Sequence, residues 1–173
     1  KIIKNKIFYE KYLSGLNKIY HKNKNYKTYN ANQEEIKVLI IECFNTKGLT
    51  GSFDKSDNNN YERFFLGSTE SKSGSNLGRR QLGRHVYMLA SKLKGFFALS
   101  VENDKKKEFL RGMQWLDKWT NEQGEKMEPY SCFTIPYSNN ELQNQKEQFP
   151  ILDQDVIEEF KELTGTSRKS GET

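Results

Sequence analysis

The sequence predicts an α+β fold, in which helices and a sheet pack together as a two-layer sandwich. Helix-like and strand-like runs follow one another in mixed order along the 173 residues, and the last strand-like runs are adjacent, which is typical of that class. Hydrophobic residues make up 34% of the chain and aromatic residues 13%, so we expect a core built on Phe and Tyr. The length suits one domain with a small extension. We divide the chain into a basic helical extension or insertion over residues 1–35 and a main domain over residues 36–173.

The first half of the chain predicts one helix, one strand and two loops. Apolar residues recur at near-helical spacing over residues 2–21, so a helix is expected there, followed by a loop over residues 22–33. Residues 36–43 are apolar on both faces after their first two positions, which predicts a central strand. Residues 45–60 are rich in Gly, Asn, Asp and Ser and predict a loop. Residues 61–66 predict a short helix or turn with two Phe.

The second half predicts a helix, three strands and a final helix. A second Gly/Ser-rich loop over residues 67–81 leads into a helix over residues 82–93. The apolar face of this helix is expected to consist of Val86, Leu89, Ala90 and Leu93. Strands are expected over residues 96–101, 109–120 and 130–137, with a turn at 121–124. After a polar insertion at residues 139–148, Asp153 can cap a helix that Gly165 ends.

The positive charge is concentrated at the N-terminus. The net charge is +5, but residues 1–30 hold eight Lys and one Glu, a local charge of +7, so the remaining residues sum to −2. A basic arm of this kind can attract nucleic acid. The alternative is a solvated helix face, and we favour it because the arm has no Arg, the better phosphate ligand.

Cysteine usage and hydropathy favour a cytoplasmic protein. Cys43 and Cys132 are too few for a disulfide framework and are expected to be reduced thiols. His21 and His85 are far apart and have no nearby Cys or His, so no zinc site is expected. The longest apolar run, residues 38–41, is far shorter than a membrane span, and no secretory signal is visible.

Two glycine-bearing segments carry the candidate chemistry. The first runs from residue 39 to 51 and reads LIIECFNTKGLTG, and the second runs from residue 74 to 84 and reads GSNLGRRQLGR. The second segment opens a predicted helix, where free backbone N–H groups and the positive helix end favour phosphate binding. Such a loop is a weak signal by itself, since Gly-rich loops before helices are common.

Together, these segments resemble the G1 and G2 boxes of the GHKL ATPases, which include histidine kinases and type II topoisomerase ATPase subunits. They are most similar to a divergent bacterial branch with a strand ending in Asp-Phe-Asn-Thr-x-Gly-Leu-Thr-Gly, then a Ser/Gly lid and Leu-Gly-x-x-Gly-Leu-Gly-Lys. The resemblance covers residues 38–101 and extends more loosely to Gly165. It implies a Bergerat-type α/β sandwich, held in part by residues 36–173, that binds ATP with Mg²⁺.

The resemblance also implies the nucleotide-binding residues. Cys43 stands where the family has the Asp that holds the adenine amino group, and Gly48 would line the base pocket. Arg84 replaces a Lys and can still hold a phosphate, whereas Gln81 replaces one of the glycines of the lid. The full set implied by the family pattern is Cys43, Asn45, Thr46, Lys47, Gly48, Gly78, Leu82, Gly83 and Arg84.

Two hypotheses follow from this pattern. The first is an ATP-binding domain of a larger bacterial protein that closes a lid and relays this state to a partner domain or a second copy. By analogy with the family, such a domain would serve DNA-linked machinery or phage defence. It would be an ATPase only if the N-box Glu and Asn lie outside this chain, since no Glu in residues 1–42 precedes an Asn by four positions. The alternative is a degenerate GHKL scaffold that acts as a non-catalytic binding or interaction module, as Cys43 and Gln81 suggest.

Overall fold

The computed structural model describes most, but not all, of the chain. The described residues are 1–15, 34–53, 59–65, 83–102, 107–116, 118–120, 123–127, 129–133 and 149–166. The loops predicted over residues 22–33 and 67–81, the insertion at 139–148 and the site residues Gly78 and Leu82 lie outside them.

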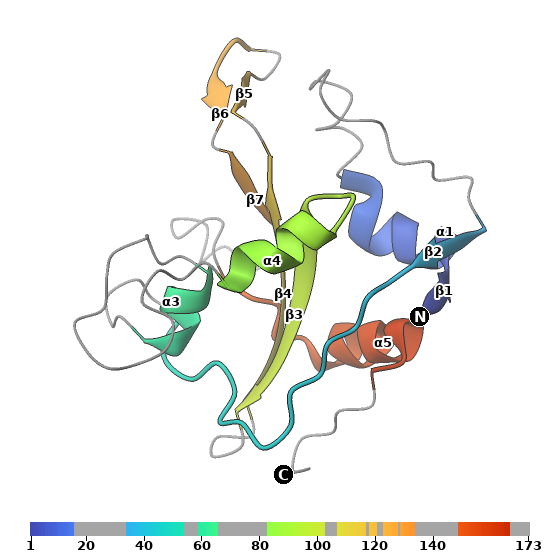
Figure 1. The fold of residues 1–173 in the computed structure, drawn as a ribbon, viewed down its shortest axis with the longest axis vertical. Coiled ribbons are helices and arrows are strands. Elements are labelled where there is room, and N and C mark those ends of the chain that lie inside the picture. The colour runs from blue at the N-terminus through green and yellow to red at the C-terminus, as the bar shows by residue number, and fades with distance from the viewer. Residues whose placement is uncertain are drawn as a thin grey trace.

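A three-stranded antiparallel sheet forms the centre of the molecule (Figure 1). Its strands are β3 (Gly95–Glu102), β4 (Lys107–Trp115) and β7 (Tyr130–Phe133), with β4 in the middle. The strand predicted at residues 96–101 is confirmed, and so is the first half of the strand predicted at 109–120. That second strand ends at Trp115, however, and β5 (Trp119–Thr120) pairs instead with β6 (Lys126–Met127) in a separate hairpin.

The N-terminal segment begins as a strand, so the helix predicted from residue 2 onward is wrong for its first three residues. β1 (Ile2–Lys4) pairs antiparallel with β2 (Glu35–Lys37), and the chain then turns through α1 (Asn5–Phe8) and the π-helical η1 (Tyr9–Leu13). β-branched Ile residues favour strands over helices, and β2 supplies a partner that the helical pattern did not anticipate.

The predicted central strand at residues 36–43 is also wrong. Only its first two residues belong to β2, whose ladder with β1 is extended by two hydrogen bonds between Lys1 and Val38, each 2.7 Å long. Residues 38–44 are not in a strand, and Leu39 and Ile41 are 75% and 58% exposed. A hydrophobic run becomes a buried strand only where a neighbouring strand completes its hydrogen bonds. Among the described residues, β3 is an edge strand that pairs only with β4, so it does not pair with residues 38–44.

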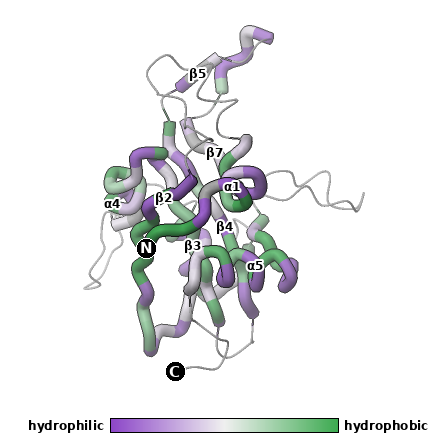
Figure 2. The backbone as a smooth tube through the Cα atoms, turned by 90° about the vertical axis from the view of Figure 1, so that its right-hand side faces the viewer, coloured by the Kyte–Doolittle hydropathy of each residue, from purple (hydrophilic) through white to green (hydrophobic). Residues whose placement is uncertain are grey.

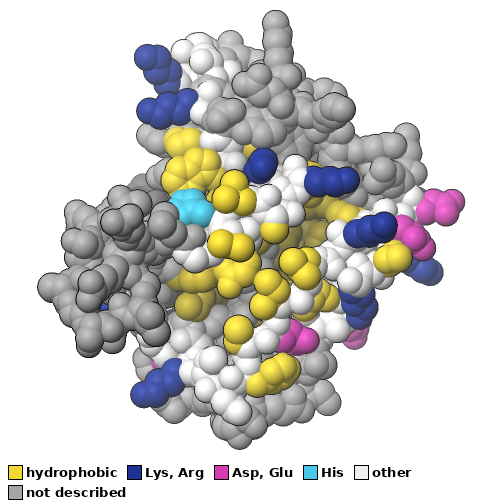
Figure 3. All heavy atoms as spheres, in the orientation of Figure 1, with side chains coloured by type: hydrophobic (Ala, Val, Ile, Leu, Met, Phe, Trp, Pro, Cys, Tyr) yellow, Lys and Arg dark blue, Asp and Glu magenta, His cyan; other side chains and the backbone are white. Residues whose placement is uncertain are grey.

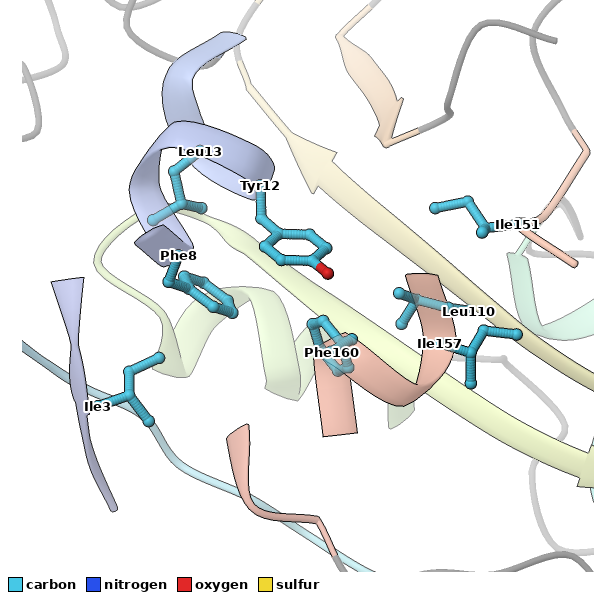
Figure 4. Packing of buried hydrophobic residues seen from close by; sticks show 8 residues of the cluster. All are labelled: Ile3, Phe8, Tyr12, Leu13, Leu110, Ile151, Ile157 and Phe160. Carbon is cyan, nitrogen blue, oxygen red and sulfur yellow. The ribbon is translucent and has the colours of Figure 1, made fainter. Parts of the chain in front are cut away.

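One face of the sheet, here called the α5 face, is covered by the N-terminal elements and by α5 (Gln154–Thr164). The core of this face is a cluster of buried side chains drawn in Figure 4: Ile3, Phe8, Tyr12, Leu13, Leu110, Ile151, Ile157 and Phe160. The rings of Phe8 and Tyr12 lie 5.1 Å apart, and that of Tyr12 lies 5.3 Å from Phe160. The cap prediction for α5 is confirmed, since the Asp153 side chain accepts two backbone N–H groups and Gly165 ends the helix in the left-handed region.

The opposite face, here called the α3 face, is covered by α3 (Asn60–Phe65) and α4 (Gly83–Ala90). Its buried cluster consists of Tyr61, Phe65, Met88, Phe109 and Met113, with Leu49, Phe53 and Phe96 packed against it. Because side chains alternate along β4, Phe109 faces this cluster while its neighbour Leu110 faces the other. The predicted α+β class is therefore confirmed, but helices cover both faces of the sheet rather than the single face expected of a two-layer sandwich, and β4 is the strand that both clusters share.

Candidate functional site

The segment that resembles the G1 box runs along the surface of the molecule. Figures 1 and 2 show residues 38–44 as an extended run on the same side as α4. Cys43, Asn45, Thr46 and Lys47 are all exposed, and Asn45 has a φ of +56°, a conformation that Asn tolerates better than most residues. The structure thus keeps these four predicted residues together at the surface.

Gly48 is the residue at which this segment contacts β3 most closely. Its φ is +76°, and a Cβ built on it would lie 2.3 Å from the carbonyl oxygen of Val101 at the end of β3. The next residue, Leu49, donates its backbone N–H to Ser100 Oγ at 2.8 Å. A glycine is therefore required here both by backbone conformation and by close approach. Sequence reasoning missed Ser100, because a serine in a predicted strand gives no sign of a partner 51 residues away.

The loop after Gly48 is closed by hydrogen bonds to the start of α3. Tyr61 N donates to Thr50 O at 3.2 Å, and Asn59 Nδ2 donates to Ser52 O at 2.7 Å. Asn59 also accepts the N–H of Glu62 at 2.9 Å, the geometry of a helix N-cap. The short helix predicted at residues 61–66 is thus confirmed and tied to the candidate loop.

The segment that resembles the G2 box is described only from its end. Gly83 is exposed and is the first residue of α4, and a Cβ built on it would meet no atom within 4 Å. Arg84 is the second residue of the same helix. Leu49 and Met88 belong to one cluster, so the G1-like loop and α4 cover the same α3 face of the sheet.

The apolar face predicted for α4 is wrong. Val86 and Leu89 are 62% and 71% exposed and Ala90 is exposed too, whereas Met88 is the buried residue of the helix. The spacing of the apolar residues located an apolar stripe on the helix, but it could not show which side of the helix packs against the sheet. The result is a group of exposed apolar side chains, here called the apolar surface, that consists of Leu39, Ile41, Phe44, Val86 and Leu89. Figure 3 shows hydrophobic side chains gathered over this side of the molecule, with Lys and Arg around them.

A buried cation lies beneath the same face. The Arg111 side chain is fully buried, donates to the Tyr61 hydroxyl and donates to Cys132 Sγ at 3.1 Å. Its guanidinium carbon lies 4.8 Å from the ring centre of Phe65, a cation–π distance. Burial raises the pKa of Tyr61, and the neighbouring Arg111 charge offsets part of that rise. The network joins α3 to the sheet, and sequence reasoning missed it because an Arg in a strand of mixed composition does not show which face it occupies.

The described residues do not include three His, Cys, Asp or Glu side chains placed to hold a metal ion. Within the same part of the chain, no helix is long and apolar enough to cross a bilayer. No family model matches this chain, and neither a curated protein nor a solved structure matches it.

Proposed function

We propose that this protein is a GHKL-type nucleotide-binding domain whose base-side loop is residues 43–48. The observation that carries the proposal is Gly48, which occupies the glycine position of the G1-like string and tolerates no side chain. Leu49, bound to Ser100, keeps the loop at the end of β3. The close approach is to β3 rather than to a ligand, so Gly48 supports the proposal by fixing the position of the loop whose exposed residues 43–47 would meet the base.

The proposed ligand is ATP, with the adenine beside Cys43 and the phosphates beside the N-terminal end of α4. Gly83 and Arg84 begin that helix, where backbone N–H groups and an Arg favour anions. Mg²⁺ would be bound together with ATP, and the hydrolytic Glu and Asn would come from outside this chain. The domain is an ATPase only if those residues are supplied.

The alternative, a non-catalytic interaction module on the same scaffold, is favoured by the apolar surface. Five large apolar side chains between 51% and 75% exposed lie on α4 and on the run at residues 38–44. Grouped apolar exposure of this kind marks an interaction site more often than scattered single residues do. A partner domain that presents apolar side chains would cover it, and the same surface could relay nucleotide binding to that partner.

Restoring the missing acceptor tests the nucleotide proposal directly. Cys43→Asp places a carboxylate where the family holds the adenine amino group, and a charged hydrogen bond contributes about 1.5–3 kcal/mol. We expect ATP with Mg²⁺ to bind about ten- to a hundred-fold more tightly to Cys43→Asp than to the unchanged protein. Isothermal titration calorimetry measures both affinities.

The matched control is Cys43→Ser, which changes the same exposed side chain without adding charge. It should leave ATP affinity close to that of the unchanged protein. GTP is a second control, because it lacks the 6-amino group and should gain nothing from the carboxylate. If ATP binds to neither protein, or if Cys43→Asp improves GTP as much as ATP, the nucleotide proposal fails and the interaction module remains.

A further inference from the structure

A cavity of about 320 Å³ lies between η1 and the α5 face of the sheet. None of residues 43–48, 83 and 84 lines it. It is therefore separate from the proposed nucleotide site, with the sheet between them. A volume of this size lies at the lower end of the range for small-molecule sites, about 300–1,000 Å³.

Three glycines, Gly15, Gly95 and Gly112, line the cavity. Gly112 of β4 stands between Phe97 and Phe133 in the strand register, and a Cβ on it would lie 2.6 Å from Phe133 Cβ and 2.8 Å from Phe97 Cε1. The two rings therefore lean over the missing side chain and lie 5.3 Å apart, edge to face. A Cβ on Gly95 would lie 3.0 Å from the Met113 carbonyl oxygen, whereas a Cβ on Gly15 would meet no atom within 4 Å.

The floor of the cavity is polar and internally bonded. Gly95, Gln114 and Ser131 form one row across the three strands. Gln114 Nε2 donates to the carbonyl of Leu93 at 2.8 Å, and Ser131 Oγ donates to Gln114 Oε1 at 3.2 Å. Because its proton is directed to Gln114, the Ser131 oxygen presents its lone pairs as an acceptor.

The walls are aromatic. Tyr12 lies 5.9 Å from Phe97 and 5.4 Å from Phe133, measured between ring centres. The one cationic side chain among the lining residues, Lys11, is paired with Glu159 at the rim. A phosphate or carboxylate would therefore meet rings and an occupied lysine, whereas a flat neutral ring would meet favourable edges and faces.

We propose that this cavity binds a small neutral aromatic molecule that carries one N–H donor, with its ring against the edges of Tyr12, Phe97 and Phe133 and its N–H donating to Ser131 Oγ. The site does not depend on the nucleotide proposal, because the two share no residue and use opposite faces of the sheet.

Indole and 1-methylindole test the proposal, because they have the same ring system and differ in the N–H. Titration calorimetry and NMR shift changes on the unchanged protein should show that indole binds more tightly. Ser131→Ala should weaken indole about threefold to tenfold, the worth of one neutral hydrogen bond, and should leave 1-methylindole unchanged. The proposal is overturned if neither compound binds, or if Ser131→Ala affects both equally.

A variant that fills the cavity provides a second test, independent of Ser131→Ala. A Cβ at Gly15 would meet no atom within 4 Å, so Gly15→Phe can place a ring in the cavity and should abolish indole binding. Ser14→Phe is the matched control, because Ser14 is exposed and does not line the cavity. Equal binding by Gly15→Phe and Ser14→Phe would overturn the proposal. If Gly15→Phe does not fold, the Ser131→Ala comparison still decides.

Discussion

The two faces of the sheet are built from the same three strands but from different parts of the chain. The α3 face uses residues 49–113, whereas the α5 face joins residues 3–13 to residues 151–160. The α3 face closes tightly around the buried Arg111 and holds the G1-like loop, whereas the α5 face is aromatic and keeps a cavity. One strand, β4, therefore carries a closely packed cluster with a buried Arg on one side and lines a hollow on the other.

The largest effect expected tests whether the faces form one cooperative unit. Phe109→Ala on the α3 face should cost about 3–5 kcal/mol, and Leu110→Ala on the α5 face about 2–5 kcal/mol, from lost burial and the cavities left behind. Both side chains are at most 2% exposed. Because β4 carries both, each variant should unfold in a single transition in urea, followed by tryptophan fluorescence and by circular dichroism. Two separated transitions would show that the faces are independent.

A smaller loss is expected at the loop on the α3 face. Gly48→Ala forces a Cβ against the Val101 carbonyl at a φ of +76°, and we expect it to lower the free energy of unfolding by about 1–3 kcal/mol. Gly83→Ala is the control, because its Cβ would meet no atom within 4 Å. Urea denaturation of the two variants measures the difference. Equal stability would show that the loop is not held by β3.

Burial raises the pKa of a tyrosine on each face, so both Tyr12 and Tyr61 should make stability fall at alkaline pH. Burial, followed by the nearby Glu159, raises the pKa of Tyr12 from 10.0 to about 12. The folded state therefore keeps a proton that the unfolded state loses, so Tyr12 contributes stability that is present below pH 10 and lost as the pH rises through about 12.

Tyr12→Phe should accordingly make the fall in stability between pH 10 and pH 12 shallower, as measured by urea denaturation across this range. Tyr61→Phe is the comparison on the α3 face. It should also lower stability near pH 7, since it removes an acceptor of the buried Arg111. The raised pKa of Tyr12 is contradicted if the stability of Tyr12→Phe falls as steeply between pH 10 and pH 12 as that of the unchanged protein.

The smallest effect is expected at the rim of the α5 face. Lys11 pairs with Glu159, and the two side chains are 49% and 35% exposed. Exposed pairs contribute about 0.2–1 kcal/mol, so Lys11→Ala should lower the melting temperature slightly and less so in high salt. A Glu159→Gln variant provides the second side of a double-mutant cycle. A loss as large as that of Phe109→Ala would mean that Lys11 holds η1 in place.

The sequence predicted best those elements whose signals are local. The Asp153 cap and the Gly165 stop are side-chain and backbone preferences within one helix, and both were confirmed. The start of the chain and the run at residues 38–44 were misjudged, because strand pairing depends on which distant segment lies alongside. The buried side of α4 was misjudged for a similar reason, since a hydrophobic stripe does not state which neighbour covers it.

The candidate site shows the same division. The string around Gly48 was visible as a motif, and its glycine has a positive φ and a close neighbour. Ser100, which binds the residue after it, was not visible, because that hydrogen bond joins positions 51 residues apart. The cavity on the α5 face was likewise out of reach, since its lining joins η1 to all three strands of the sheet.

The contact between Tyr12 and α5 also affects the order in which the two faces can fold. Tyr12 and its hydrogen-bond acceptor Val156 are 144 positions apart, whereas Tyr61 and Arg111 are 50 apart. At a synthesis rate of about 5–20 residues per second, Tyr12 is made roughly 7–29 s before Val156. Short-range contacts also close faster than long-range ones. During synthesis, the α3 face, which holds the candidate loop, can therefore form before the α5 face. Tyr12 and its aromatic neighbours become buried only after α5 has been made.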